Sequence, residues 1–448
     1  MRLGLSLACS LIVFTASGAR PATSSANSPA FVYVAAQKYE PLAWLRGKDR
    51  FPRGAALMIH DASGQRPLLP EFAASADPAV FFDGNRLLFA GKKATRDHWQ
   101  IWEMNLPGGA PRRLTSCAGN CIRPFYLPED RFIFAEQFGS QTAIKAAPLS
   151  GGQALTLTYN PGHSLPSDVL RDGRILFDSV LPSNSVRPEI YALYSDGSGV
   201  EAYRCDHGNA RHSGRQVASG DIVFAHERGL ARFTPALAHQ EDLPLPSQEY
   251  AGDVAELSNR DWLLTYRSGP HGRFHIARWT PETQQLQTIL SDDHVDLLQP
   301  TLIATRAVPN RHPSALHDWN YANLLCLNAY TSKLHIPEGT ISTVRLYTRE
   351  VSGHETTLGT AAVQKDGSFY LRTPADRPLK IALLDATGKS LQKEAGWFWL
   401  RRGEQRVCVG CHAGPETAPE NAVPAVLLRS TIAADMIGAT THTASGGH

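Results

Sequence analysis

Three residues near the C-terminus have the types and the spacing of a cofactor-attachment site. Residues 406–416 read RVCVGCHAGPE and place Cys408, Cys411 and His412 in a Cys-x-x-Cys-His motif. Two thiols at this spacing can add to the vinyl groups of a haem, and the adjacent histidine can then bind the iron as an axial ligand. Gly410 makes the tight turn between the thiols easy. The motif predicts a covalently attached c-type haem.

Three other interpretations compete for the same residues. Two cysteines and one histidine provide three of the four ligands of a tetrahedral zinc site, and Cys326 or a distant histidine would have to complete it. A thiol–disulfide oxidoreductase is less favoured, because a proline-rich stretch follows the motif where a helix N-terminus usually lowers the thiol pKa. A plain structural disulfide between Cys408 and Cys411 leaves His412 unexplained.

The composition excludes several classes of protein. The 448 residues carry 44 basic and 42 acidic side chains, a net charge of +2, and show no basic stripe, so nucleic acid is not an expected partner. Charged residues make up 19% of the chain and apolar residues 42%, which argues against both a membrane protein and a disordered one. The length is sufficient for two or three domains.

The N-terminus has the pattern of an export signal. A short basic start is followed by an apolar run too short to span a bilayer, and then by the small residues SGA. We expect a signal peptide over residues 1–19, a polar linker over 20–30, a periplasmic or secreted location, and no membrane span after cleavage. In such a compartment Cys117 and Cys121 could close a small disulfide, although two free thiols remain an alternative.

An internal repeat organises the first two thirds of the chain. A tight turn precedes an apolar strand that ends in an aromatic residue, and the unit recurs at steps of about 45 residues, the spacing of propeller blades. The aromatic residues are Phe89, Phe134, Phe177, Phe224 and Tyr266. We predict a β-propeller of about six blades over residues 31–297, with five or seven blades as alternatives.

The remaining sequence changes character at about residue 301. Alternating strands with hairpin turns at Asp366-Gly367 and Thr387-Gly388 predict a small β-sandwich-like domain over 301–400. This domain leads directly into the Cys-x-x-Cys-His segment at 401–424, and a tail follows over 425–448. The expected fold class is therefore all-β: a propeller, a sandwich and a C-terminal motif segment.

Two stretches resemble known families. DPAVFFDGNRLLFAGKKATRDHWQIWEMNLPGGAPRRLT resembles the repeat of periplasmic Tol-type propellers. VQKDGSFYLRTPADRPLKIALLDATGKSLQKEAGWFWLRRGEQRVCVGCHAGPETAPENAVP, together with the upstream LLCLNAY, resembles the middle domain of the hydrazine synthase alpha subunit family. The resemblance covers most of the mature chain and implies a propeller packed beside a haem-bearing middle domain.

The resemblance also implies site residues. It makes His412, with Cys326 as a second ligand, similar to a zinc site, and it places a tyrosine on the haem iron a few residues downstream. That tyrosine is missing here: Glu416 stands four residues past His412, and no tyrosine follows the motif. The family also has a further domain with a second haem, whereas this sequence contains one Cys-x-x-Cys-His. We therefore do not expect hydrazine synthesis.

Several other residues are weaker candidates. His163 with Asp168, and His207 with His212, could line a site on the propeller, although ordinary surface or turn positions are the more common explanation. Met436 could be a distal haem ligand or simple apolar packing. Trp397 and Trp399 point to one face of a strand, where they could wall a haem crevice or belong to the sandwich core.

The sequence therefore predicts an exported monohaem c-type redox protein, acting in electron transfer or as an oxidoreductase, with a redox partner docking on the propeller face. The alternative is a non-enzymatic periplasmic binding or assembly protein in which Cys-x-x-Cys-His is a zinc or disulfide staple. The sequence does not identify a substrate, a distal haem ligand or an oligomeric state.

Overall fold

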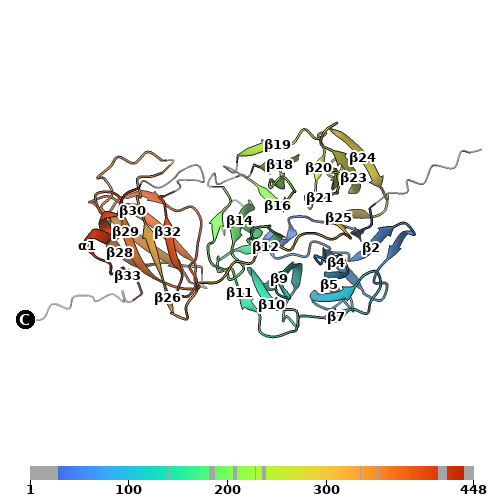
Figure 1. The fold of residues 1–448 in the computed structure, drawn as a ribbon, viewed down its shortest axis with the longest axis horizontal. Helices are drawn as coiled ribbons and strands as arrows, with labels where there is room; N and C mark the ends of the chain where they lie inside the picture. The colour runs from blue at the N-terminus through green and yellow to red at the C-terminus, as the bar shows by residue number, and fades with distance from the viewer. Residues whose placement is uncertain are drawn as a thin grey trace, which may run out of the picture.

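The protein consists of two all-β domains that lie side by side along its longest axis (Figure 1). No helix of the described part of the chain is long and apolar enough to cross a membrane. The predicted signal peptide, His207 and His412 lie outside the described residues. The computed structural model describes residues 29–437 with the exception of 140, 181–186, 205–208, 228, 235–238, 333, 351–352 and 412–420.

The larger domain is a six-bladed propeller, which confirms the fold predicted from the repeat. Its blades are formed in chain order by β25 with β1–β3, by β4–β7, β8–β11, β12–β15 and β16–β19, and by β20–β24. The strands are β1 (Phe31–Ala36), β2 (Ala55–Asp61), β3 (Gly64–Pro67), β4 (Ala74–Val80), β5 (Arg86–Lys92), β6 (Gln100–Asn105), β7 (Arg112–Arg113), β8 (Cys121–Leu127), β9 (Arg131–Phe138), β10 (Gln141–Pro148), β11 (Leu155–Thr156), β12 (His163–Val169), β13 (Ile175–Val180), β14 (Glu189–Leu193), β15 (Glu201–Ala202), β16 (Arg211–Gln216), β17 (Ile222–His226), β18 (Gly229–Phe233), β19 (Gln240–Asp242), β20 (Glu249–Tyr250), β21 (Ala255–Glu256), β22 (Trp262–Arg267), β23 (His275–Thr280), β24 (Gln285–Leu290) and β25 (Asp296–Leu302).

The ring closes through its two chain ends. The last propeller strand, β25, pairs antiparallel with the first, β1, so that Leu298 lies opposite Val34. Both side chains are fully buried. The first blade therefore holds strands from both ends of the propeller sequence, and opening it would expose two strand edges.

The repeated aromatic strands are the second strands of their blades, counted from the axis. The aromatic residues of the repeat lie on β5, β9, β13, β17 and β22. All of them are buried in the core except Tyr266, which is partly exposed. Asp-Gly turns precede two of these strands, where Gly84 and Gly173 have φ angles of 81° and 90°. A positive φ suits glycine best, which explains the turn signal in the sequence.

The innermost strands carry a second repeat, which the sequence analysis missed. Their pairing shifts at corresponding points, for example between Ala76 and Ala79 in β4 and between Ile122 and Phe125 in β8. Such bulges re-aim side chains. Non-glycine residues with φ angles of 53–57° occupy these points in five blades: Asp77, Arg123, Ser213, Asp253 and Gln299.

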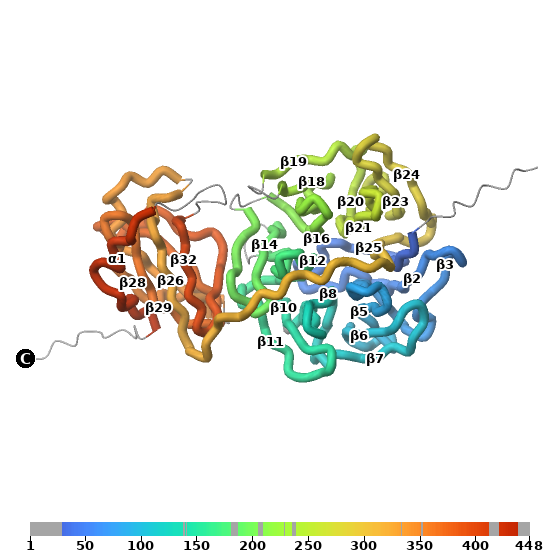
Figure 2. The backbone as a smooth tube through the Cα atoms, in the orientation of Figure 1, coloured from blue at the N-terminus to red at the C-terminus, as the bar shows by residue number. Residues whose placement is uncertain are grey.

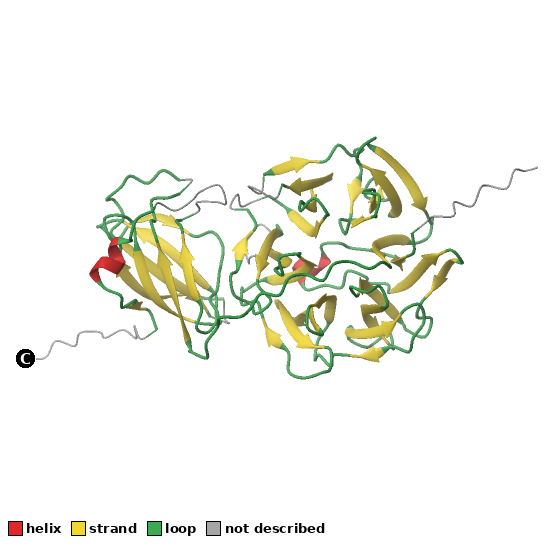
Figure 3. Cartoon of the chain, in the orientation of Figure 1, coloured by secondary structure: helices red, strands yellow, loops and turns green. Residues whose placement is uncertain are grey.

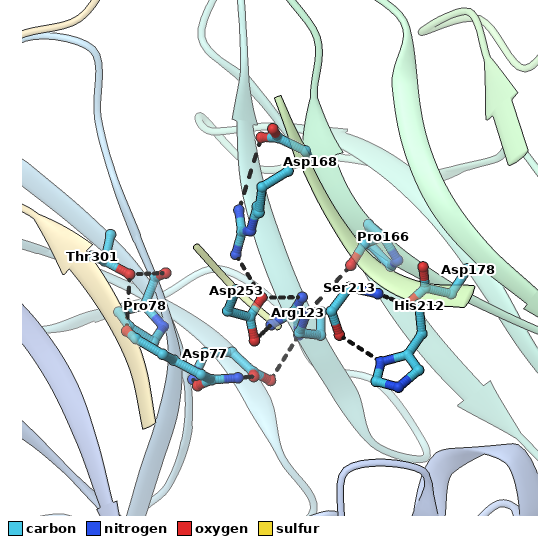
Figure 4. A network of polar contacts seen from close by, with 12 residues as sticks. Asp77, Pro78, Arg123, Pro166, Asp168, Asp178, His212, Ser213, Asp253 and Thr301 are labelled. Carbon is cyan, nitrogen blue, oxygen red and sulfur yellow. Dashed lines mark hydrogen bonds and ion pairs between the residues drawn. The ribbon is translucent and has the colours of Figure 1, made fainter. Parts of the chain in front are cut away.

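These bulges turn charged side chains toward the propeller axis, where they form a buried network (Figure 4). The Arg123 guanidinium donates to both carboxylate oxygens of Asp253 at 2.8 and 3.1 Å, and Arg215 donates to the same carboxylate at 3.0 Å. Asp77 accepts from Arg50 and from the Arg123 backbone N–H. Burial alone would raise the pKa of Asp253, but Arg123 and Arg215 hold that pKa well below its usual range. Buried charges of this kind persist only when they are paired.

Two segments close over the propeller channel. The short 3-10 helix η1 (Ala43–Arg46), drawn red inside the propeller in Figure 3, packs Trp44 and Leu45 into an apolar cluster. Residues 303–320 form a second segment, the strap, which crosses the propeller face on its way to the second domain (Figure 2).

The strap is bound to the propeller at the Asp-Gly turns. Its Arg306 and Asn310 backbone N–H groups donate to the carbonyl oxygens of Phe82 and Arg171 at 2.9 and 2.8 Å. A Cβ atom on Gly173 would come closer than 3.0 Å to the Asn310 carbonyl oxygen. Glycine is therefore needed at this turn both for its φ angle and for the approach of the strap.

The smaller domain is a β-sandwich, as predicted. One sheet has the order β32-β26-β29-β33 and the other β28-β27-β30-β31. Inward-facing apolar residues such as Leu324 and Val344 alternate with more exposed ones along the strands. The elements are β26 (Tyr321–Cys326), β27 (Thr343–Arg349), β28 (Glu355–Ala362), β29 (Phe369–Pro374), β30 (Leu379–Leu384), β31 (Ser390–Lys393), β32 (Gln405–Cys408), α1 (Ala425–Arg429) and β33 (Ala434–Asp435).

Candidate functional site

The motif begins at the end of a short strand that is held by a parallel neighbour. Strand β32 pairs with β26 so that Cys408 lies opposite Cys326, and the Leu327 N–H donates to the Cys408 carbonyl oxygen at 2.9 Å. This pairing fixes the backbone that presents Cys408. It also brings together two cysteines that are 82 residues apart in the sequence.

The turn between the two motif thiols is packed against the loop that follows β26. A Cβ atom on Gly410 would come closer than 3.0 Å to the carbonyl oxygens of Thr331 and Asn328. The same loop is fixed from its other side, because the Ala329 N–H donates to the Gly367 carbonyl oxygen at 2.9 Å. Glycine at position 410 is therefore required by close packing, in addition to the flexibility that the sequence suggested.

The thiols lie at the edge of the sandwich core. Cys326 is 2% exposed, and Cys408 and Cys411 are partly buried against the same apolar cluster. All three are free thiols. Burial is the main cause that raises the pKa of Cys411 to about 12, and it also raises the pKa of Cys326 and of Cys408. Reactive thiols of Cys-x-x-Cys oxidoreductases have the opposite shift.

The predicted site residues are therefore brought together in part. Cys408 and Cys411 flank one turn, and Cys326, one of the two further ligands that the zinc interpretation considered, lies opposite Cys408. Two free thiols at a two-residue spacing beside an apolar surface fit covalent haem attachment. They equally fit two ligands of a thiolate-bound metal, with Cys326 as a third. His412 lies outside the described residues.

The segment that leads into β32 is anchored on the propeller. Trp399 is 2% exposed and belongs to the propeller core, where its indole N–H donates to the Gly197 carbonyl oxygen at 3.2 Å. The Arg401 side chain is also buried and donates to the Thr156 carbonyl oxygen and to the Tyr159 hydroxyl. The sandwich therefore inserts two large side chains into the neighbouring domain just before the motif.

A buried carboxylate continues this anchor toward Cys408. Glu404 accepts from the Arg401 backbone N–H at 2.7 Å, from the Gly199 N–H at 3.2 Å and from the Arg406 side chain at 2.9 Å. Arg406 also donates to the Val200 carbonyl oxygen at 2.9 Å. Residues 399–406, which we call the anchor segment, thus connect the propeller to the strand that presents the motif.

The anchor segment was not predicted from the sequence, and the prediction for one of its residues was wrong. Trp399 was expected in a haem crevice or in the sandwich core, but it packs into the propeller. No local pattern in the sequence predicted the burial of three charged residues, because their partners lie about 200 residues earlier in the chain. These residues are Arg401, Glu404 and Arg406. A buried network of charged side chains can be recognised only when the positions of both interacting segments are known.

The remaining candidates are spread over the molecule. Met436 is buried in the same apolar cluster as the three thiols. His163 is buried in the propeller, where its ring hydrogen-bonds the Thr142 hydroxyl at 3.0 Å. Asp168 accepts backbone N–H groups at the propeller axis. His212 lies on β16, and burial lowers its pKa to about 4.

Cys117 and Cys121 form a disulfide, which was one of the two outcomes considered from the sequence. The Glu136 carboxylate lies close to both sulfur atoms, a grouping that could hold a metal ion if the cysteines were reduced. In the disulfide form the sulfur atoms are not thiolate ligands. The bridge therefore has a structural role in the loop that precedes β8.

Comparison with known proteins supports the architecture. Residues 331–413 match the family described as hydrazine synthase alpha subunit middle domain. Over 77 residues, 17% of this chain, the sequence is 34% identical to hydrazine synthase subunit alpha of Kuenenia stuttgartiensis, and the aligned part is only 10% of that subunit.

Solved structures extend the likeness to the propeller. Hydrazine synthase of Kuenenia stuttgartiensis aligns with a TM-score of 0.78 over 90% of this chain and 71% of that chain, at 17% identity. TolB from Acinetobacter baumannii aligns with a TM-score of 0.46 over 61% of this chain and 66% of that chain, at 16% identity. Residues 331–413 in the second domain are therefore similar to the hydrazine synthase alpha subunit middle domain, and the propeller and sandwich together share the fold of the matched part of that synthase.

Proposed function

We propose that the protein is an exported monohaem c-type redox protein. The haem is attached through Cys408 and Cys411, and His412 is the axial ligand. The observation that carries this proposal is the pair of free thiols at the end of β32, two residues apart and partly buried against an apolar cluster. The sequence around them supplies the histidine that haem attachment requires.

The chain's own residues have three tasks in this proposal. The pairing of β32 with β26 holds the Cys408 backbone, and the packed turn at Gly410 sets the direction of Cys411. The apolar cluster beside the thiols excludes water from one side of the site. The anchor segment fixes the site relative to the propeller, which would dock a redox partner. A haem bound here supplies reversible one-electron transfer at its iron.

The proposed role is electron transfer or oxidoreductase chemistry rather than hydrazine synthesis. The chain is related to the synthase by sequence over a short segment only. A shared fold does not transfer an activity.

The test is a pyridine haemochrome spectrum of protein exported from a host with c-type maturation, taken after acid–acetone extraction. We expect haem that survives extraction in the wild type and is absent in Cys408→Ala/Cys411→Ala. Cys326→Ser is the matched control, since it removes a neighbouring thiol outside the motif and should retain the haem. An unextractable haem in the double variant, or no haem in the wild type despite active maturation, contradicts the proposal.

One observation favours a second function. Because Cys326 lies opposite Cys408, three thiols and His412 could form a zinc site, and the propeller would then act as a binding or assembly module. In that case the purified protein is colourless and contains one zinc per chain. The zinc would be lost in Cys326→Ser, the variant that leaves a haem in place.

A further inference from the structure

A cavity of about 540 Å³ lies at the propeller axis beneath the strap. Inner strands from around the ring form its wall, including β4, β12 and β16, and strap residues 304–307 lie over it. The volume falls within the range of about 300–1,000 Å³ that is usual for small-molecule sites. The lining includes no residue of the Cys-x-x-Cys-His motif or the anchor segment. Whatever binds here does not depend on the proposed haem.

The charged groups of the cavity do not balance. The lining contains four arginines and three carboxylates: Arg171, Arg215, Arg260, Arg306, Asp168, Asp253 and Glu256. Asp253 is shared with a fifth arginine, because Arg123 donates to both of its oxygens from within the network shown in Figure 4. The cavity end of the channel therefore has more positive than negative charge.

The carboxylates are already engaged. Asp168 accepts the backbone N–H groups of Val169 and Gln216 at 2.9 and 2.8 Å. Glu256 accepts the Ala218 N–H and pairs with Arg260. Since their oxygens are taken by groups of the protein, the carboxylates are poorly placed to recruit a cation.

Two of the arginines make no direct contact with a carboxylate. Desolvation lowers the pKa of Arg306, and Asp168 is close enough to oppose this shift. Among the described residues, Arg171 and Arg306 form no ion pair. Arg171 donates to the carbonyl oxygens of Ala218 and Val217 at 2.9 and 3.3 Å, and Arg306 donates to the Val80 carbonyl oxygen at 3.2 Å. A guanidinium has five N–H donors in a planar fork that suits carboxylate and phosphate oxygens. Both side chains therefore keep their charge and unused donors.

The strap places Arg306 without help from a ligand. Its backbone N–H is bonded to the Phe82 carbonyl oxygen, and its guanidinium carbon lies 4.8 Å from the centre of the Phe82 ring. Arg171 is fixed in the same way, because its carbonyl oxygen accepts the Asn310 N–H of the strap. Side chains that are ordered beforehand lose less conformational entropy when they bind.

We propose that the propeller cavity is a binding site for a small dianion of the carboxylate or phosphate class, held by Arg171 and Arg306. The dianion would neutralise the two guanidinium groups that form no ion pair. Both residues are exposed, so the binding should weaken as the salt concentration rises. The strap then serves as one wall of a ligand site as well as a connection between the domains.

The experiment is isothermal titration of the mature, full-length protein at low ionic strength with inorganic phosphate and, separately, with succinate. We expect saturable binding of at least one of these dianions at one site per chain, and no binding of the neutral analogue succinamide. Arg306→Gln should weaken the binding at least about tenfold, the effect of losing a charge-assisted hydrogen bond. Arg113→Gln removes the same charge from an exposed strand of the propeller and should leave the affinity unchanged.

The two probes separate the classes. Binding of phosphate alone assigns the phosphate class, and binding of succinate alone assigns the dicarboxylate class. The proposal is overturned if neither dianion binds at millimolar concentration. It is also overturned if Arg306→Gln binds the dianion as tightly as the wild type and the Arg113→Gln control do. Because Arg306 lies in the exposed strap, its substitution is compatible with folding, which circular dichroism of the same samples checks.

Discussion

Replacing Trp399 by alanine should weaken the coupling of the two domains. The side chain is 2% exposed and lies in the core of the propeller, although the next residue, Leu400, is buried in the core of the sandwich. Truncating a buried tryptophan costs about 3–5 kcal/mol, and the lost indole bond to the Gly197 carbonyl oxygen adds about 1 kcal/mol. We therefore expect Trp399→Ala to lower the free energy of unfolding by about 4–6 kcal/mol.

The assay is urea denaturation followed by fluorescence, together with limited proteolysis of the strap at residues 303–320. In the variant we expect an earlier first transition and faster cleavage of the strap. Trp319→Ala is the matched control: this tryptophan is 43% exposed and stacked between His317 and Tyr321, so its loss should cost about 1 kcal/mol. A loss below about 1 kcal/mol for Trp399→Ala, or equal losses for the two variants, would refute the idea that the anchor segment couples the domains.

Three further predictions follow from the buried charges and the strap. Arg123→Leu removes the bidentate partner of the buried Asp253, which keeps only Arg215, and should lower the free energy of unfolding by about 3 kcal/mol in urea denaturation. Lys38→Ala breaks only an exposed ion pair and should cost less than about 1 kcal/mol. Similar losses for the two variants would contradict the burial argument. Burial raises the pKa of Asp178 from 3.8 to about 7, so the folded protein keeps a proton that the unfolded chain releases, and this group lowers stability as pH rises from about 4 to about 7. Asp178→Asn should therefore become more stable relative to the wild type between about pH 5 and about pH 8, and a pH-independent difference would contradict this. Gly173→Ala should speed proteolysis of the strap, because the new Cβ atom would clash with the Asn310 carbonyl oxygen. Gly388 has a similar φ angle, but a Cβ atom there would have no neighbour within 4 Å, so Gly388→Ala should leave the strap protected. Equal cleavage rates for the two variants would show that the strap does not depend on the Gly173 turn.

The sequence predicted the parts of the fold that depend on local patterns. The turn-and-strand repeat identified the second strands of the blades, since a tight turn and a buried aromatic are set by neighbours in the chain. The closure of the ring was not readable, because β25 meets β1 across more than 250 residues. The bulges of the innermost strands do have a sequence pattern, which was not used: a residue with positive φ is followed by proline, and this pair recurs at propeller spacing. The pairs are Asp77-Pro78, Arg123-Pro124 and Gln299-Pro300.

The candidate site was predictable to a similar extent. The motif cysteines are local in sequence, so their spacing alone marked them as a candidate site, and the covalent haem stays a prediction. Cys326 was considered from the sequence as one possible further zinc ligand beside a distant histidine, and the family resemblance also implied it. Its position opposite Cys408 is a consequence of parallel pairing between distant strands. The burial of Arg401 and Glu404 could not be predicted, because a charged residue that becomes buried looks the same in sequence as one that stays exposed to water.

The most direct test of the central proposal is the intact mass of the protein exported with active c-type maturation, followed by peptide mapping. We expect the mass to increase by that of one haem, located on the peptide that contains Cys408 and Cys411. This increase should disappear in Cys408→Ala/Cys411→Ala. An intact mass equal to that of the processed polypeptide alone, from cells that mature other c-type cytochromes, would contradict it.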